Sequence, residues 1–178
     1  SQAIKTPSPM ESRAPDDSRL AAEMRHYLRA HRHGVLSTSS AKFSGYPFGS
    51  VVTFMVDFQA QPVFLISTLA EHHRNLRADS RASLLVQDPP SNDVQAQSRL
   101  TCLGDAAPAE SGLVDALRAR YLRYHPASRQ LFDMADFQLW VLRPKAYRFI
   151  GGFGRIHWVT GTQIPGFASE LAQSEQTL

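Results

Sequence analysis

Short apolar runs that come in hairpin-sized pairs dominate this chain of 178 residues. Each run is bounded by glycine, proline or polar residues, which is typical of β-strands. The predicted strands cover residues 35–38, 50–58, 63–67, 82–86, 100–106, 137–142, 147–150 and 156–159. Because strands outnumber helices, an antiparallel barrel is favoured over a doubly wound parallel sheet. We therefore expect a mainly β protein with flanking helices.

Two amphipathic helices are expected beside these strands. Apolar residues recur at helical spacing from Leu20 to His31, and Gly34 is placed to end this first helix. The second helix begins near Ser111, a residue type favoured as an N-cap, and ends before Pro126. Glycines and prolines further predict a turn over residues 41–49, a loop over residues 88–97 and a turn at Pro144 and Lys145.

Length and composition indicate one domain. Hydrophobic residues make up 43% of the chain, which is enough to build one core. Residues 1–18 are rich in proline and polar residues, and residues 163–178 are poor in apolar residues. Both segments are expected to be flexible tails. The folded domain is predicted to cover residues 19–162.

Charge and cysteine content exclude several functions. The formal net charge is +3, and no basic run is interleaved with aromatic residues, so no nucleic acid partner is expected. Cys102 is the only cysteine, which excludes an internal disulfide, and its strand-like neighbours favour a buried, inert thiol.

No apolar stretch reaches the roughly 20 residues that span a bilayer, and no signal-peptide core is present, so we expect a soluble, cytoplasmic protein without a membrane partner.

A polar cluster follows the predicted strand at residues 63–67. Ser67 and Thr68 supply hydroxyl groups, and Arg74 and Asn75 follow within a short polar helix. Hydroxyls, free backbone N–H groups and an arginine bind an anion without a metal or a base. The cluster therefore predicts a phosphate site, although the two hydroxyls are also compatible with simple helix capping.

Five ordered blocks of sequence resemble the flavin-binding split-barrel proteins related to pyridoxamine 5′-phosphate oxidase, and more closely their haem-utilisation branch, the HugZ and HutZ type. The blocks are HGVLST at residues 33–38, GYPFGSVV at 45–52, ISTLAEHHRNLRADSRASLLV at 66–86, RLTCLGDA at 99–106 and GGFGRIHWV at 151–159. The resemblance implies a six-stranded antiparallel split β-barrel that forms a homodimer. It also implies two flavin mononucleotide (FMN) sites in clefts between the subunits.

The resemblance also assigns roles to individual residues. Ser50, Val51 and Thr53 are expected beside the isoalloxazine ring, with Gln87 near it. Ser67, Arg74 and Asn75 are expected to hold the phosphate, and Thr68 and His72 complete the set of candidate cofactor-binding residues. In the haem branch, a histidine at the position of His72 is thought to meet an acidic residue of the partner subunit at the position of Asp136. A surface histidine without a role is an equally open reading of His72.

Three functions remain open at this stage. The first is a flavin-dependent oxidoreductase that acts on a small-molecule substrate, in which FMN supplies the chemistry and no catalytic residue can be named. The second is haem binding and degradation, for which His72, Asp136 and His157 are the candidate residues. The sequence favours flavin, because the resemblance implies an axial histidine from a C-terminal segment and no histidine follows His157. The third is a flavin or haem carrier.

A metal site built by the protein alone is not expected. His31 and His33 lie two residues apart, a spacing that does not place two side chains on one helix face. We expect them instead to interact with the C-terminal end of the first helix.

Overall fold

The computed structural model describes residues 17–93, 97–152 and 155–160. The helices are α1 (Asp17–Ala30), α2 (Glu71–Ala78), α3 (Val114–Tyr124) and α4 (Arg129–Phe132). The strands are β1 (His33–Ser39), β2 (Pro47–Val56), β3 (Pro62–Ser67), β4 (Arg81–Gln87), β5 (Arg99–Pro108), β6 (Phe137–Ile150) and β7 (Ile156–Thr160). The predicted tails, residues 1–18 and 163–178, lie outside the described residues, apart from residues 17 and 18, with which α1 begins.

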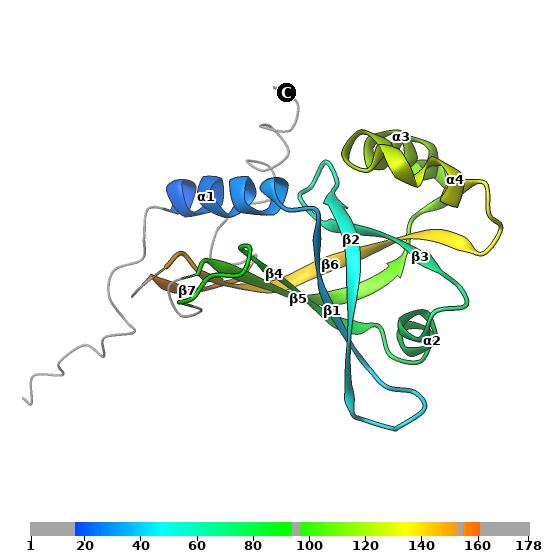
Figure 1. Ribbon diagram of the computed structural model, residues 1–178, viewed down its shortest axis with the longest axis horizontal. Helices are drawn as coiled ribbons and strands as arrows, with labels where there is room; N and C mark the ends of the chain where they lie inside the picture. The colour runs from blue at the N-terminus through cyan, green and yellow to red at the C-terminus, as the bar shows by residue number, and fades with distance from the viewer. Residues whose placement is uncertain (1–16, 94–96, 153–154, 161–178) are drawn as a thin grey trace, which may run out of the picture.

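Six strands close into an antiparallel barrel, as predicted. The order along the sheet is β3-β2-β1-β4-β5-β6-β7, and β3 also pairs with β6, which closes the first six strands into a ring. β7 pairs with β6 beyond this ring, and Figure 1 shows the two strands reaching the left side of the molecule. Within the described residues, β7 pairs with β6 alone and residues 47–53 of β2 pair with β1 alone, so both present an open strand edge.

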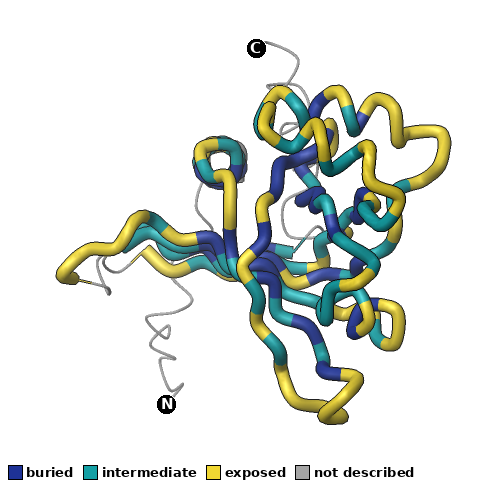
Figure 2. The backbone as a smooth tube through the Cα atoms, turned by 45° about the vertical axis from the view of Figure 1, so that its right-hand side comes forward, coloured by how far each residue is buried: buried dark blue, intermediate teal, exposed yellow. Residues whose placement is uncertain are grey.

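Alternate side chains of the strands fill the barrel with an apolar core. Leu36, Phe54, Phe64, Leu84 and Leu100 all point inward and are fully buried. Figure 2 shows this buried interior in dark blue, with the exposed β1–β2 turn at the bottom. The residues between them on each strand face outward, because successive side chains of a strand alternate.

The first helix is amphipathic as predicted, but Gly34 does not end it. Leu20, Met24 and Leu28 are buried, and the helix ends at Ala30. Gly34 lies inside β1, where an added Cβ would meet the Leu85 carbonyl oxygen at 2.6 Å. Glycine is therefore needed for the close approach of β1 and β4 rather than for the helix terminus.

Of two predicted turns, one is shorter than expected and the other is part of a continuous strand. β2 already begins at Pro47, so the turn covers residues 41–45 alone. β6 runs without a break through Pro144 and Lys145. Gly104 pairs with Pro144 and Leu103 with Ala146, which leaves Lys145 as the extra residue of a β-bulge. A bulge accommodates a proline, which has no N–H to donate to a regular ladder.

The prediction of an N-cap at Ser111 is also wrong. A 3₁₀ turn (Ser111–Leu113) precedes α3, and no side chain caps that helix. Burial of Tyr121 on the apolar face of α3 holds the helix against the barrel instead. Cys102 behaves as predicted, because it is fully buried and its burial raises the pKa of the thiol to about 12.

Candidate functional site

Three of the predicted ring-binding residues share the outer face of the barrel. Val51 pairs with Val35, and Val35 pairs with Leu85, so these three side chains form one row across β2, β1 and β4. Thr53 and Gln87 lie two residues farther along their strands, on the same face. Val51 is 75% exposed. The row therefore presents apolar side chains to the outside.

A shallow cavity of about 470 Å³ lies farther along this outer face. Ser37 and Ser83, a cross-strand pair, place two hydroxyl groups in its wall. Arg81 and Lys145 add two cationic side chains. Asp105 also lines the cavity, and Arg81 pairs with the Asp79 carboxylate at 2.7 Å, so the cavity combines small side chains with charges of both signs. This cavity could not be predicted from the sequence, because it arises from strands far apart in the chain.

Ser50 belongs to the opposite face of β2 and contacts α2. It pairs with the buried Leu36, and its hydroxyl lies 3.0 Å from Nδ1 of His72. Burial, and secondarily the charge of His73, lowers the pKa of His72. His72 therefore favours its neutral form at neutral pH. Ser50 and His72 come together as a pair, but away from the face that carries Val51 and Thr53.

The two hydroxyl residues at the end of β3 contact Asp136. The Ser67 hydroxyl donates to Oδ2 of Asp136 at 3.1 Å and accepts the Leu69 N–H at 3.1 Å. The Thr68 N–H donates to the Asp136 carbonyl oxygen at 2.6 Å. Asp136 thus binds the end of β3 within its own chain. Its pairing with a histidine of a second subunit stays a prediction.

Arg74 and Asn75 are neighbours with different environments. Asn75 is fully buried; its Oδ1 accepts the Ala41 N–H at 2.9 Å and its Nδ2 donates to the Thr38 hydroxyl at 3.0 Å. The Arg74 side chain is 68% exposed and lies 3.9 Å from the Glu71 carboxylate. Arg74 is available to a ligand, whereas the amide of Asn75 ties α2 to β1.

The environments of two further residues, His157 and Tyr121, could not be predicted from the sequence. His157 pairs with the buried Phe149, whereas its neighbour Trp158 pairs with Arg148 on the outer face. Tyr121 was not among the predicted site residues; its hydroxyl lies 2.7 Å from that of Thr53 and joins α3 to β2. Its place on the apolar face of the second predicted helix was the available signal.

The comparison with protein families agrees with this architecture. The model for the CREG β-barrel matches residues 15–164. The chain belongs to the CREG β-barrel family. Members of a family share a fold more reliably than an activity, so individual relatives of this CREG-family chain carry the information on function.

Two relatives are haem oxygenases by name. The chain is 35% identical over 130 residues to the chloroplastic non-canonical heme oxygenase HOZ of Arabidopsis thaliana, covering 73% of this chain and 40% of that protein. It is 25% identical over 154 residues to the heme oxygenase HutZ of Vibrio cholerae, covering 84% of this chain and 86% of that protein. The chain thus spans less than half the length of HOZ.

A solved structure confirms the split-barrel resemblance. It is a protein of Clostridium acetobutylicum related to general stress protein 26, of the pyridoxinephosphate oxidase family. The TM-score is 0.60 at 12% identity, with 83% of this chain and 98% of that chain covered. At this identity the likeness concerns the fold. Within the described ranges, none of the helices has the length and apolar character that crossing a bilayer requires.

Proposed function

We propose that this CREG-family chain binds haem on the outer face of its barrel and takes part in haem degradation. The similarity to two proteins named as heme oxygenases carries this proposal. It reverses the order of the sequence analysis, which put a flavin-dependent oxidoreductase first. When bound, haem iron would supply the oxygen chemistry, and the protein would bind and orient the group.

The outer face has the chemistry that a porphyrin requires. The row of Val35, Val51 and Leu85 offers apolar side chains to a flat macrocycle. Arg148, whose guanidinium carbon lies 5.1 Å from the centre of the Trp158 ring, extends this row across β6 and β7. Cationic side chains beside an apolar surface match the two propionates of haem.

His33 is the best placed histidine for the iron on this face. It is exposed at the start of β1, two residues before Val35 and opposite Thr53. Other histidines bond within the chain: His72 to Ser50, and His125 to the Phe54 carbonyl oxygen. His157 lies on the other side of β7 from Trp158. We therefore propose that His33, which was expected from the sequence to lie at the helix end, would bind the haem iron.

A flavin remains the second candidate because of Arg74. Its guanidinium, 68% exposed on the helix that follows Ser67 and Thr68 in the chain, would suit the phosphate of FMN. A homodimer belongs to both proposals. The exposed apolar side chains on the outer face would be covered by a second copy, as a cleft between subunits requires.

A titration of the purified protein with haem and with FMN tests these proposals. We expect a Soret band that saturates with added haem, and a shift of this band in His33→Ala but not in His26→Ala, a matched exposed histidine on α1. Saturating flavin binding without a saturable Soret band would instead support FMN, and Arg74→Ala should then weaken that binding about tenfold or more. Bound haem that survives a reductant and oxygen would indicate a carrier.

A further inference from the structure

Arginine side chains and aromatic rings stack on one another where the end of α1, the β2–β3 turn and α3 meet. The guanidinium carbon of Arg32 lies 4.6 Å from the centre of the Tyr124 ring. That of Arg120 lies 5.5 Å from the centre of the same ring and 4.8 Å from the centre of the Phe58 ring. These four side chains, which we call the arginine ladder, therefore join three segments that are far apart in the sequence.

The ladder has one buried end and one exposed end. Arg120 is 5% exposed, and its Nε donates to the Val56 carbonyl oxygen of β2 at 2.7 Å. Arg32 is exposed, and its Nη1 donates to the carbonyl oxygens of Arg29, at 2.6 Å, and His31, at 3.5 Å. Because the bonds described for Arg32 use Nη1, its Nε and Nη2 remain available to an acceptor outside the chain.

Two more arginines add positive charge to the ladder. Burial lowers the pKa of Arg120, and the charges of Arg123 and Arg29 lower it further, against the opposing charge of Asp57. Charges affect one another in this way over about a Debye length, roughly 8–10 Å in salt solution. Arg29 and Arg123 therefore lie in the same corner of the molecule as the ladder.

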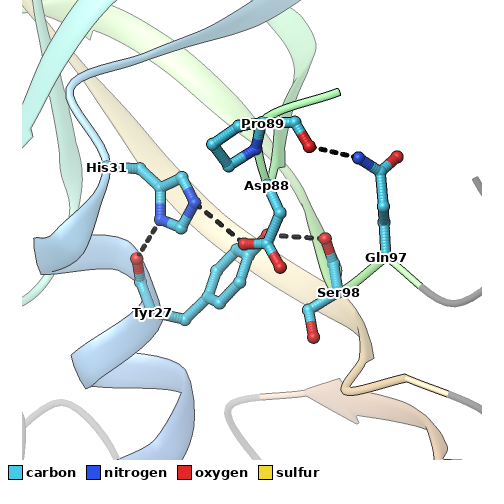
Figure 3. Close-up of polar contacts among 6 residues, drawn as sticks. All are labelled: Tyr27, His31, Asp88, Pro89, Gln97 and Ser98. Atoms are coloured by element: carbon cyan, nitrogen blue, oxygen red, sulfur yellow. Dashed lines mark hydrogen bonds and ion pairs between the residues drawn. The ribbon is translucent and has the colours of Figure 1, made fainter. Parts of the chain in front are cut away.

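The acids of this region are engaged with other groups. Asp88 pairs with His31, with 3.2 Å between its Oδ1 and the Nε2 of the ring, as Figure 3 shows. Asp57 is buried and accepts two backbone N–H groups of its own turn. Among the described residues, neither Arg32 nor Arg123 forms an ion pair with a carboxylate. The exposed part of the corner therefore keeps its positive charge.

Carboxylates fit these exposed groups better than nucleobases do. A guanidinium presents a planar fork of N–H donors to a carboxylate, and it can do so while its face lies on a ring. A strand of nucleic acid also needs open rings on which its bases stack. Tyr124 already contacts two arginines and is partly buried, which leaves Phe58, 47% exposed, as the open ring of the ladder.

We propose that Arg29, Arg32, Arg120 and Arg123 form a docking surface for an acidic segment of a partner protein, rich in aspartate and glutamate. The exposed Arg32 and Arg123 bind its carboxylates, and Tyr124 positions Arg32. The attraction is electrostatic, so it speeds association and weakens as salt screens it. Arg32 directly precedes β1, so the docked segment lies beside the start of that strand.

Fluorescence anisotropy with the full chain and a labelled oligoglutamate peptide tests this surface. We expect saturable binding at low salt that weakens as salt is added. Arg123→Glu should raise the dissociation constant about tenfold or more, because a carboxylate then faces the carboxylates of the peptide. Tyr124→Leu should raise it about threefold without a change in net charge, because Arg32 loses the ring that positions it. Circular dichroism checks that both variants fold.

Arg77→Glu is the matched control, because Arg77 is exposed in the last turn of α2, as Arg123 is in the last turn of α3. It makes the same change in net charge and should alter the dissociation constant by less than about twofold. The proposal is overturned if the peptide does not bind saturably, or if Arg77→Glu weakens binding as much as Arg123→Glu. It is also overturned if Tyr124→Leu binds as the wild type does.

A labelled oligothymidylate distinguishes the two classes of partner. We expect it to bind more weakly than the oligoglutamate peptide. Tighter binding of the oligothymidylate through Arg123 would overturn the proposal, since the partner would then be a nucleic acid. The protein is used without haem, so none of these outcomes depends on the haem proposal.

Discussion

Two adjacent polar residues of α2, Arg74 and Asn75, have different environments. The helix is polar almost all round, with Asn75 and Leu76 as its buried residues. Asn75 uses its amide to satisfy the Ala41 N–H and the Thr38 hydroxyl. A buried amide with both ends bonded contributes to stability, because its removal leaves partners without a bond. Arg74, one residue earlier, faces solvent.

Substitution of Asn75 should lower the stability of the protein, whereas substitution of Arg74 should leave it nearly unchanged. We expect Asn75→Ala to lower the free energy of unfolding by about 1–3 kcal/mol, because it leaves the buried Thr38 hydroxyl and the Ala41 N–H without their partner. Arg74→Ala should change it by no more than about 0.5 kcal/mol, as for other exposed positions. Urea denaturation measures both. Equal, small losses in the two variants would contradict the structural role of Asn75.

At the scale of the elements, a buried carboxylate organises the turn between β2 and β3. Asp57 Oδ1 accepts the backbone N–H groups of Gln59 and Gln61, both at 2.9 Å. Burial raises the pKa of Asp57 above its ordinary value, although these hydrogen bonds and the charge of Arg120 oppose the rise. The Asp57 carboxyl at the centre of this turn therefore binds a proton more tightly in the folded chain than in the unfolded chain.

The raised pKa of Asp57 predicts a pH dependence with a definite sign. A carboxyl whose pKa is higher in the folded state stabilises most below its unfolded pKa, and this contribution is lost as the pH rises through the folded pKa. Relative to Asp57→Asn, the wild type should therefore lose stability as the pH increases above the ordinary value of 3.8. A tenfold difference in proton affinity between the folded and unfolded chain corresponds to about 1.4 kcal/mol. Denaturation curves between pH 3.5 and 7 measure the difference, and parallel pH profiles for the two proteins would refute it.

At the scale of the whole molecule, the closed barrel could be predicted and several details could not. The hairpin-sized apolar runs predicted antiparallel strands, and the family resemblance of the five sequence blocks predicted a barrel of six. Pro144 and Lys145 looked like a turn because local signals cannot show that β5 pairs with β6 through a bulge. Similarly, the residues of the candidate site alternate between two faces. The sequence grouped Ser50 with Val51, but the pleat of β2 sends one inward and the other outward.

The exposed outer face bears on the oligomeric state. Val51, Leu103 and Trp158 are large apolar residues on it, and they are 75%, 38% and 54% exposed. In the sheet order, β1 and β4 lie between β2 and β5, and β6 lies between β5 and β7. A monomer that left this face in water would gain by pairing it with a second copy, because burying apolar area is favourable.

A charge on this face should therefore weaken the homodimer that we propose. In a two-fold dimer each substitution enters the interface twice, so Val51→Asp should raise the dissociation constant about 100-fold or more, at about 1.4 kcal/mol for each tenfold step. Light scattering after size-exclusion chromatography measures the mass, and circular dichroism checks the fold. Leu113→Asp is the matched control, since Leu113 is 51% exposed on the turn before α3 and should leave the mass unchanged. A wild type that is monomeric at micromolar concentration, or a Val51→Asp variant as dimeric as the wild type, would show that a second copy does not cover this face.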